Sequence, residues 1–285
     1  MTAEGDVKKR ILTGVLILIA ALSVLKIKND TDYHLLTDAV EKGDNVRLEF
    51  LLSCGANPDV IDGVALFDIF CEVTSFKMTP LQRACSKGDY TAVQTLILHG
   101  ADVNYAPANA FYSPLIRAEW SENAENKVKI VKLLIACGAD VNYSCNYGTV
   151  LSWLVSETDP ENEAVDLEIL DILIKNGANH DGIDHSCMRK ACWFKLEDFI
   201  RYFIEKCDYS ASGGEVISLY CKGGEPYSKD TLDYLLNLGA DVYEKDSSGK
   251  NAIDYLREQD REDLAEYLIE KSEETTPTES IFPAL

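Results

Sequence analysis

The chain has 285 residues, of which 46% are hydrophobic and 26% charged, a balance typical of a folded protein rather than a disordered one. Its 48 acidic and 27 basic residues give a formal charge of −21. Nucleic-acid backbones repel so acidic a surface, so we expect no DNA or RNA partner. The excess charge serves solubility in one interpretation and recognition of a basic protein in the other.

An apolar segment lies near the N-terminus. Residues 11–25 are uncharged and mostly apolar, with Lys8, Lys9 and Arg10 before them and Lys26 and Lys28 after. As a helix the segment would be about 22 Å long, which is short for a bilayer span. Three interpretations stay open: an uncleaved single-pass anchor, a cleaved secretory signal and a buried cap helix. We expect residues 1–28 to be a membrane anchor or signal segment.

The charges around this segment bear on localisation. Basic residues before it outnumber those close after it, which favours a cytoplasmic N-terminus and repeats outside the cytoplasm. The leading expectation is therefore a single-pass membrane protein, and the alternative is a secreted or periplasmic one after cleavage. The nine cysteines weigh against an oxidising compartment.

A short phrase recurs through the rest of the chain. Gly-Ala-Asp-Val-Asn stands at 100–104 and 138–142, Gly-Ala-Asp-Val at 239–242, and Gly-Ala-Asn at 55–57 and 177–179. Each copy follows a run of aliphatic residues. Glycine closes a helix well because it enters the left-handed region without a Cβ penalty. The phrase therefore predicts the end of a repeated helical unit.

The spacing of the copies gives the size of the unit. The glycines stand 45, 38, 39 and 62 residues apart, and the last gap holds a degenerate copy with Cys207 in the glycine place. A final copy places Ser272 there, 33 residues after Gly239. The underlying unit is thus about 33 residues long, with insertions. It opens with Thr79-Pro80-Leu81, Ser113-Pro114-Leu115 or Gly148-Thr149-Val150, where a hydroxyl caps a helix and proline can take its first position.

In these openings and endings the chain resembles the ankyrin repeat family. The resemblance covers residues 31–272 and implies an all-α solenoid of about seven helix-turn-helix repeats with β-hairpin fingers, preceded by one apolar N-terminal helix. Residues 273–285 read as a disordered tail. The histidine of the family opening is replaced by Gln82, Ile116 and Ser152, so we expect looser turns there.

The cysteines read as packing residues. Cys85, Cys192 and Cys221 fall in one small slot of the first helix when the units are aligned, and Cys54 and Cys137 share a slot before the closing glycine. None has metal-ligand spacing, and the histidines do not cluster with them. We expect neither a metal nor a cofactor.

No catalytic motif is present, so we expect a binding protein rather than an enzyme. The resemblance implies a monomeric array that binds a protein through the concave face formed by finger tips and first helices. Tyrosine is a good interface anchor. The expected partner-binding residues are Tyr105, Tyr143, Tyr147, Tyr243, Gln82, Arg83, Arg117, Trp120 and Trp153. The leading hypothesis is a membrane-tethered scaffold; the alternative is an exported acidic inhibitor or immunity-type protein that neutralises a basic toxin or enzyme.

Overall fold

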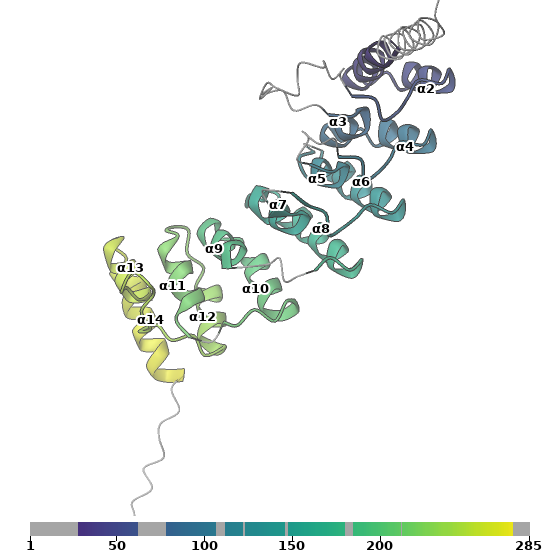
Figure 1. The fold of residues 1–285 in the computed structure, drawn as a ribbon. Coiled ribbons are helices and arrows are strands. Elements are labelled where there is room, and N and C mark those ends of the chain that lie inside the picture. Colours follow the sequence, from purple (N-terminus) through teal and green to yellow (C-terminus); the bar gives the residue numbers. More distant parts are fainter. Residues whose placement is uncertain are drawn as a thin grey trace, which may run out of the picture. The chain divides into compact units, whose positions relative to one another are not determined.

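A computed structural model describes residues 28–61, 78–106, 112–121, 123–145, 148–179, 185–211 and 213–275. The chain divides into two compact units, Met1–Val150 and Leu151–Leu285, and each is treated by itself below. Both consist of consecutive helix pairs (Figure 1). Among the described residues no helix is long and apolar enough to cross a membrane. The predicted anchor at residues 11–25 lies outside the described residues.

The described part of the first unit starts with the helical residues 28–42. It continues with α2 (Asn45–Ser53), α3 (Pro80–Lys87), α4 (Tyr90–Leu98), α5 (Pro114–Glu119), α6 (Ala124–Ala136) and the short strands β1 (Ser144–Cys145) and β2 (Gly148–Thr149). Like packs on like: α3 contacts α5, α2 contacts α4, and α4 contacts α6. First helices thus form one layer and second helices another.

The helix starts follow from their capping residues. Thr79 and Gln82 form a reciprocal capping box at α3, with Pro80 in the first turn, and Ser113 caps α5 in the same manner. Asp89 accepts a hydrogen bond from Ala92 N at the start of α4. These caps satisfy amides that have no partner inside the helix.

Glycine is required where α3 turns into α4. Gly88 has φ +68°, and a Cβ there would lie 2.3 Å from Ser121 Oγ. Gly100, the first residue of the recurring phrase, also has a left-handed φ of +87°. However, no atom lies within 4 Å of the position that its Cβ would take. Conformation alone demands glycine at residue 100, and space demands it as well at residue 88.

The recurring phrase also joins neighbouring repeats. The Asn104 side chain accepts a hydrogen bond from Asp140 N at 2.8 Å and donates one to Gly138 O at 2.9 Å. One repeat earlier, Asp59 occupies the equivalent position and accepts from Asp102 N at 2.9 Å. The last residue of one phrase therefore binds the backbone of the next.

The fingers contain little regular strand. β1 and β2 pair antiparallel, with Ser144 opposite Thr149 and Cys145 opposite Gly148. They form the one β-hairpin of the described residues. Within those residues, the predicted β-hairpin fingers are therefore found at a single repeat.

The second unit holds the remaining helices. α7 (Val150–Glu157) starts at the boundary and is followed by α8 (Glu163–Lys175), α9 (His185–Phe194), α10 (Glu197–Lys206), α11 (Glu215–Lys222), α12 (Lys229–Asn237), α13 (Ala252–Glu258) and α14 (Glu262–Thr275). The layering is the same: α9 contacts α11 and α11 contacts α13, while α8 contacts α10 and α12 contacts α14.

The degenerate repeats differ from the expected alignment by small shifts. Cys207 is the C-terminal cap of α10, and the left-handed place of glycine is taken by Asp208, with φ 54°. The alignment that put Cys207 in the glycine place is therefore wrong by one residue. Likewise α14 runs through Ser272 to Thr275, past the expected end of the repeats. Residues 276–285 of the predicted tail lie outside the described residues.

The cysteines pack as predicted in the first-helix slot. Cys85, Cys192 and Cys221 are each 0% exposed, on α3, α9 and α11. Cys54 and Cys137 are exposed, and all the described cysteines are free thiols. The shared slot places a small apolar side chain between neighbouring first helices, which explains cysteine there without any chemistry.

Candidate functional site

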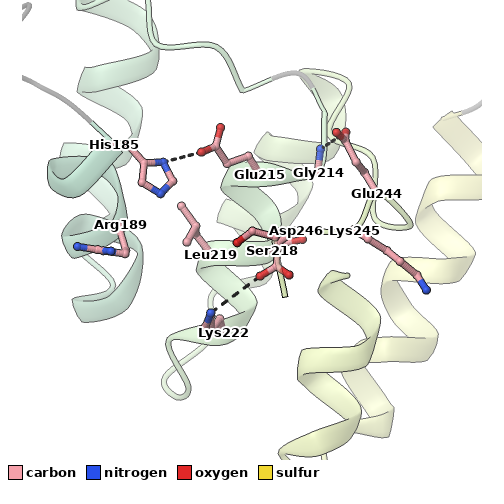
Figure 2. Close-up of a pocket in the computed structure, with 11 residues that line it drawn as sticks. His185, Arg189, Gly214, Glu215, Ser218, Leu219, Lys222, Glu244, Lys245 and Asp246 are labelled. Atoms are coloured by element: carbon pink, nitrogen blue, oxygen red, sulfur yellow. Dashed lines mark hydrogen bonds and ion pairs between the residues drawn. The ribbon is translucent and has the colours of Figure 1, made fainter. Parts of the chain in front are cut away.

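A hollow of about 680 Å³ opens on the second unit over its first helices and the loop that follows α12. Figure 2 shows its lining. We call it the groove. Its residues come from α9, α11 and the loop at 244–247, and they are His185, Arg189, Gly214, Glu215, Ser218, Leu219, Lys222, Glu244, Lys245, Asp246 and Ser247.

The loop sits against the N-terminus of α11 because residue 214 is glycine. A Cβ on Gly214 would lie 2.5 Å from Glu244 Cβ and 2.9 Å from the Asp241 carbonyl oxygen. This close approach lets Gly214 N donate a hydrogen bond to Glu244 Oε2 at 2.6 Å, as Figure 2 shows. A carboxylate at a helix N-terminus is favoured by the helix dipole. The loop and α11 therefore form one wall.

Asp246 fixes the shape of the loop. Its carboxylate accepts hydrogen bonds from Ser248 N at 2.7 Å and from Tyr255 Oη at 2.6 Å. The Tyr255 hydroxyl is the main reason why the pKa of Asp246 is lowered, and the Ser248 and Lys250 amides and the charge of Lys222 add to it. Lys222 Nζ stands 3.9 Å from Asp246 Oδ2. Asp246 is thus an ionised structural group.

The groove carries both signs of charge. His185 Nδ1 lies 2.5 Å from Glu215 Oε1, an ion pair when the imidazole is protonated. Arg189 and Lys245 are exposed, and within the described residues neither has a hydrogen bond, an ion pair or an aromatic contact. These two cations are the groups in the groove that are available to another molecule.

Ser218 lines the groove, and its hydroxyl is buried without a hydrogen-bond partner among the described residues. The residue is 2% exposed, and its Oγ has no hydrogen-bond partner among the described residues. A buried hydroxyl without a partner costs about 1–3 kcal/mol. The lining therefore includes a polar atom that does not stabilise the fold.

A buried lysine follows the end of α9. Lys195 is 7% exposed and donates a hydrogen bond to the Tyr220 carbonyl oxygen. Its Nζ stands 3.9 Å from the centre of the Tyr220 ring and 4.6 Å from that of Tyr227. Burial lowers the pKa of Lys195 to about 8, against partial opposition from Cys221, Cys192 and Glu197. Aromatic rings take the place of water around this ammonium group.

A hydrogen-bonded network surrounds the same lysine. Tyr220 Oη donates to Glu197 Oε1 at 2.9 Å, and Thr231 Oγ1 donates to Glu197 Oε2 at 2.7 Å. Tyr227 Oη stands 2.8 Å from both the Cys221 carbonyl oxygen and Gln259 Oε1. The network links α10, α11 and α12 to the turn after α13, so it joins α11, which lines the groove, to its neighbours.

The cysteines on the two helices that line the groove are buried. Burial raises the pKa of Cys192 and of Cys221 to about 12, so neither is a thiolate near neutral pH. Among the described residues no group of three or more His, Cys, Asp and Glu side chains is placed to hold a metal ion. The arrangement can supply charged and polar contacts to a bound surface.

The expected partner-binding residues fall into several groups. Tyr105 and Tyr143 are half-buried in the first unit, Tyr243 is exposed in the second, and Trp153 is half-buried there. Tyr147 lies outside the described residues. Tyr243 stands at the phrase position of Asn104, one residue earlier than Tyr105 in its repeat, so these tyrosines are not equivalent.

Gln82 is a correction to the expected set. Its side chain is fully buried, and Nε2 donates to the Tyr105 carbonyl oxygen at 3.1 Å and to that of Tyr112 at 2.8 Å. It cannot meet a partner without disrupting the finger. The expectation of a looser turn at this opening is also wrong, because Gln82 ties the turn to its own helix start and to the following finger.

Arg117 is a second correction. It is 6% exposed, with its guanidinium carbon 4.6 Å from the ring centre of Tyr112 and 4.5 Å from that of Trp120. Burial lowers its pKa. Trp120, half-buried, also meets Tyr112 edge to face at 4.8 Å. Arg83 is half-buried and pairs with Glu41. These residues form an internal stack and an ion pair rather than an open row.

Sequence reasoning missed the groove residues on α9 and α11. A signal was available, since Arg189 and Lys190 precede Trp193 and Phe194 within one short helix of a very acidic chain. Their repeat was the most degenerate, which hid the register that brings α9 beside α11.

The helix pairs form two layers, and most pairs end in a residue with a left-handed φ. These two features define a helical repeat protein. The model of ankyrin repeats (3 copies) matches residues 36–145. The chain is also similar to the human ASB11 ankyrin repeat domain, in its crystal structure, with TM-score 0.56 and 20% identity over 77% of this chain and 90% of that one. No curated protein matches the chain. Residues 36–145 thus match ankyrin repeats, and the solved structure shows the same fold. Ankyrin repeats generally mediate protein–protein interaction.

Proposed function

We propose that this chain is a protein-binding ankyrin-type scaffold and that the groove on its second unit is the principal contact surface. The observation that carries the proposal is the pair of unpartnered cations, Arg189 and Lys245, on opposite walls of one hollow. Most other cations of the described residues already have an acidic or aromatic partner. Two that have none, in the same concave surface, are the groups that a partner would meet.

The walls of the groove are well ordered for this role. Gly214 and Glu244 join the loop to α11, and Asp246 holds the loop in shape. A surface whose geometry exists before binding loses less conformational entropy on association. The lining offers complementary charges and, at Leu219, an apolar contact, which is the mixture found in protein interfaces.

Affinity capture with charge-reversed variants tests the proposal. The immobilised full chain would be compared with Arg189→Glu/Lys245→Glu and with the control Lys175→Glu/Lys206→Glu, which makes the same change of charge on α8 and α10. We expect a protein enriched on the wild type and on the control, and lost on the groove variant. Captured proteins that bind all three chains equally would contradict the groove as the contact surface.

Placing the reacting group directly in the groove gives a second readout. A photo-crosslinking amino acid at Lys245 would be compared with one at Lys206, which is exposed outside the lining. We expect the captured protein to be crosslinked from position 245 and not from position 206. Equal yields from both positions would remove the groove from consideration.

We also propose that residues 11–25 tether the scaffold to a membrane, with the repeats outside the cytoplasm. The support is the uncharged apolar stretch between Lys8-Lys9-Arg10 and Lys26. Carbonate extraction of membranes from cells that express the full chain is the test. Retention in the pellet, with loss on deletion of residues 1–28, is expected; release by carbonate would contradict an integral anchor. Protease added to intact cells tests the side, since protected repeats would contradict the placement.

The alternative function, an exported inhibitor of a basic toxin or enzyme, is favoured by one observation, the formal charge of −21. Steering by that charge would make the association rate fall steeply with salt. Stopped-flow association of the captured partner at rising ionic strength separates the two hypotheses. A rate that does not fall with salt would exclude the inhibitor.

A further inference from the structure

A second hollow lies beside the groove and shares only Arg189 with it. It has a volume of about 390 Å³ and is lined by Ser156 of α7 and by Ser186, Arg189, Lys190, Trp193 and Phe194 of α9. We call it the α9 hollow. Sites of about 300–1,000 Å³ suit small ligands or a few side chains. All its residues belong to the second unit.

Two aromatic side chains stand exposed in this hollow. Trp193 is 51% and Phe194 43% exposed; among the exposed large apolar residues of the described chain, only Phe50 and Tyr243 are also aromatic. They are consecutive on a helix, yet both line the same hollow. Exposed tryptophan is a poor use of apolar surface in a free monomer and a frequent anchor in interfaces.

The backbone that carries these rings is held firmly. A Cβ on Gly223 would lie 2.8 Å from Trp193 Cα and 2.9 Å from the Cys192 carbonyl oxygen, so the turn after α11 packs directly on the end of α9. Lys195, just beyond, is anchored on Tyr220. The rings are thus displayed from a fixed helix end, which reduces the entropy lost on binding.

The charge of the hollow is opposite to that of the chain. Arg189 and Lys190 line it, and none of its lining residues in the described part of the chain is acidic. Lys190 donates to the Ser156 carbonyl oxygen, and its Nζ stands 4.4 Å from the centre of the Phe194 ring. Its position is therefore set by α7 and by Phe194, while Arg189 has no such partner among the described residues. A chain with a formal charge of −21 here offers two adjacent positive charges beside two aromatic rings.

We propose that the α9 hollow binds a short acidic segment of a partner protein, with an aromatic side chain of that segment packed against Trp193 and Phe194 and its carboxylates on Arg189 and Lys190. The rings supply apolar contact area, and the two cations select carboxylates over ammonium groups. The acidic remainder of the chain would repel a partner with an extensive acidic surface. We therefore expect the negative charge of the partner to be confined to the short segment that binds. The proposal rests on the proposed scaffold function and names the chemistry of its partner.

Labelled peptides and the full chain give the test by fluorescence anisotropy. The probe is a 12-residue peptide with four glutamates around one central phenylalanine. Two comparison peptides carry alanine for phenylalanine or lysines for the glutamates. We expect the probe to bind at least about tenfold more tightly than either comparison peptide.

Variants of the chain locate the binding. Trp193→Ser and Lys190→Glu are expected to weaken binding of the probe at least about tenfold. The matched controls are Leu98→Ser, an exposed apolar residue of α4, and Lys206→Glu, an exposed lysine of α10; both should keep the wild-type affinity. Far-UV circular dichroism of each variant checks that it keeps its helices; Trp193, Leu98 and Lys206 are exposed and Lys190 is half-buried.

Three results would overturn the proposal: equal or tighter binding of the lysine peptide, full affinity in both Trp193→Ser and Lys190→Glu, or self-association of the wild type that Trp193→Ser abolishes. The last would assign the hollow to a second copy of the chain. Failure here is distinct from failure of the scaffold function, because crosslinking of a captured protein from position 245 involves no residue of the α9 hollow.

Discussion

The buried ammonium group of Lys195 makes stability depend on pH in an unusual direction. Its pKa is about 8 in the folded chain, against an ordinary value of 10.5. Between these values the unfolded chain binds more protons than the folded one, so the free energy of unfolding rises with pH. The destabilisation is full below pH 8 and is relieved as pH rises from about 8 to 10.5.

The magnitude follows from the two pKa values. Their separation corresponds to about 3.4 kcal/mol of unfavourable free energy below pH 8, and linkage returns about 1.3 kcal/mol of it between pH 7 and pH 9. The aromatic contacts and the hydrogen bond to Tyr220 are made by the charged form, so they are already part of the balance at neutral pH. The wild type should therefore gain about 1 kcal/mol over this interval through Lys195 alone.

The assay compares urea unfolding of the wild type with that of Lys195→Met at pH 7, 8 and 9. Groups common to both chains cancel in the difference, and tryptophan fluorescence follows both units, through Trp120 in the first and Trp153 and Trp193 in the second. The difference in unfolding free energy should shift by about 1 kcal/mol in favour of the wild type by pH 9. Lys206→Met, an exposed lysine on α10, is the control and should show no shift. A difference that stays flat, or that moves the other way, would refute a depressed pKa at Lys195.

Four further predictions concern stability and thiol reactivity. Gly88→Ala should lower the unfolding free energy by about 2–3 kcal/mol and Gly100→Ala by only about 1, because residue 88 combines a left-handed φ with a clash against Ser121; thermal melts of both would show it, and equal losses would contradict the steric part. Gln82→Leu removes two buried hydrogen bonds and half of a capping box, and should cost about 2–4 kcal/mol in chemical unfolding, whereas a loss below about 0.5 would mean that the finger is not held by this side chain. Ser218→Ala should leave stability unchanged or raise it by up to about 1 kcal/mol, and clear destabilisation would show that the hydroxyl is paired in solution. Under native conditions a maleimide should label the exposed thiols and spare the buried ones of the first-helix slot, and early labelling of the slot would contradict its packing; the first set is Cys54 and Cys137, the second Cys85, Cys192 and Cys221.

Much of the fold could be predicted because its rules are local. The phrase ends a helix wherever it occurs, since glycine must close the turn, and the hydroxyls of Thr79 and Ser113 mark helix starts through caps made three residues away. The cysteine slot followed from alignment of the repeats. The single-residue shift at Asp208 shows the limit: a non-glycine residue can take the left-handed position when packing holds it there.

The candidate site was harder to predict because it depends on which residues end up next to each other across repeats. Because Gln82 and Arg117 are polar, the sequence predicted that both lie on an exposed face. In the structure the Gln82 amide donates to two carbonyl groups of the next finger, and Arg117 stacks between aromatic rings. Conversely, Arg189 looked ordinary in sequence. That Arg189 has no acidic or aromatic partner among the described residues can be seen only in the structure, where most other lysines and arginines have one.

The side-chain links of Asn104 and Asp59 to the next phrase have a consequence for how such a chain can change its length. Each link needs an acceptor at the fifth position of one phrase and a backbone amide at the third position of the following one, so any two repeats with these features can be joined. Duplication or exchange of a whole repeat between such positions leaves the junction intact. At the later copy, the third-position amide is Asp241 N, and it donates to a backbone acceptor, the Gly213 carbonyl oxygen, at 3.0 Å. The junction between copies is therefore made by a side chain at these two places in the first unit and by the backbone at the copy near the groove.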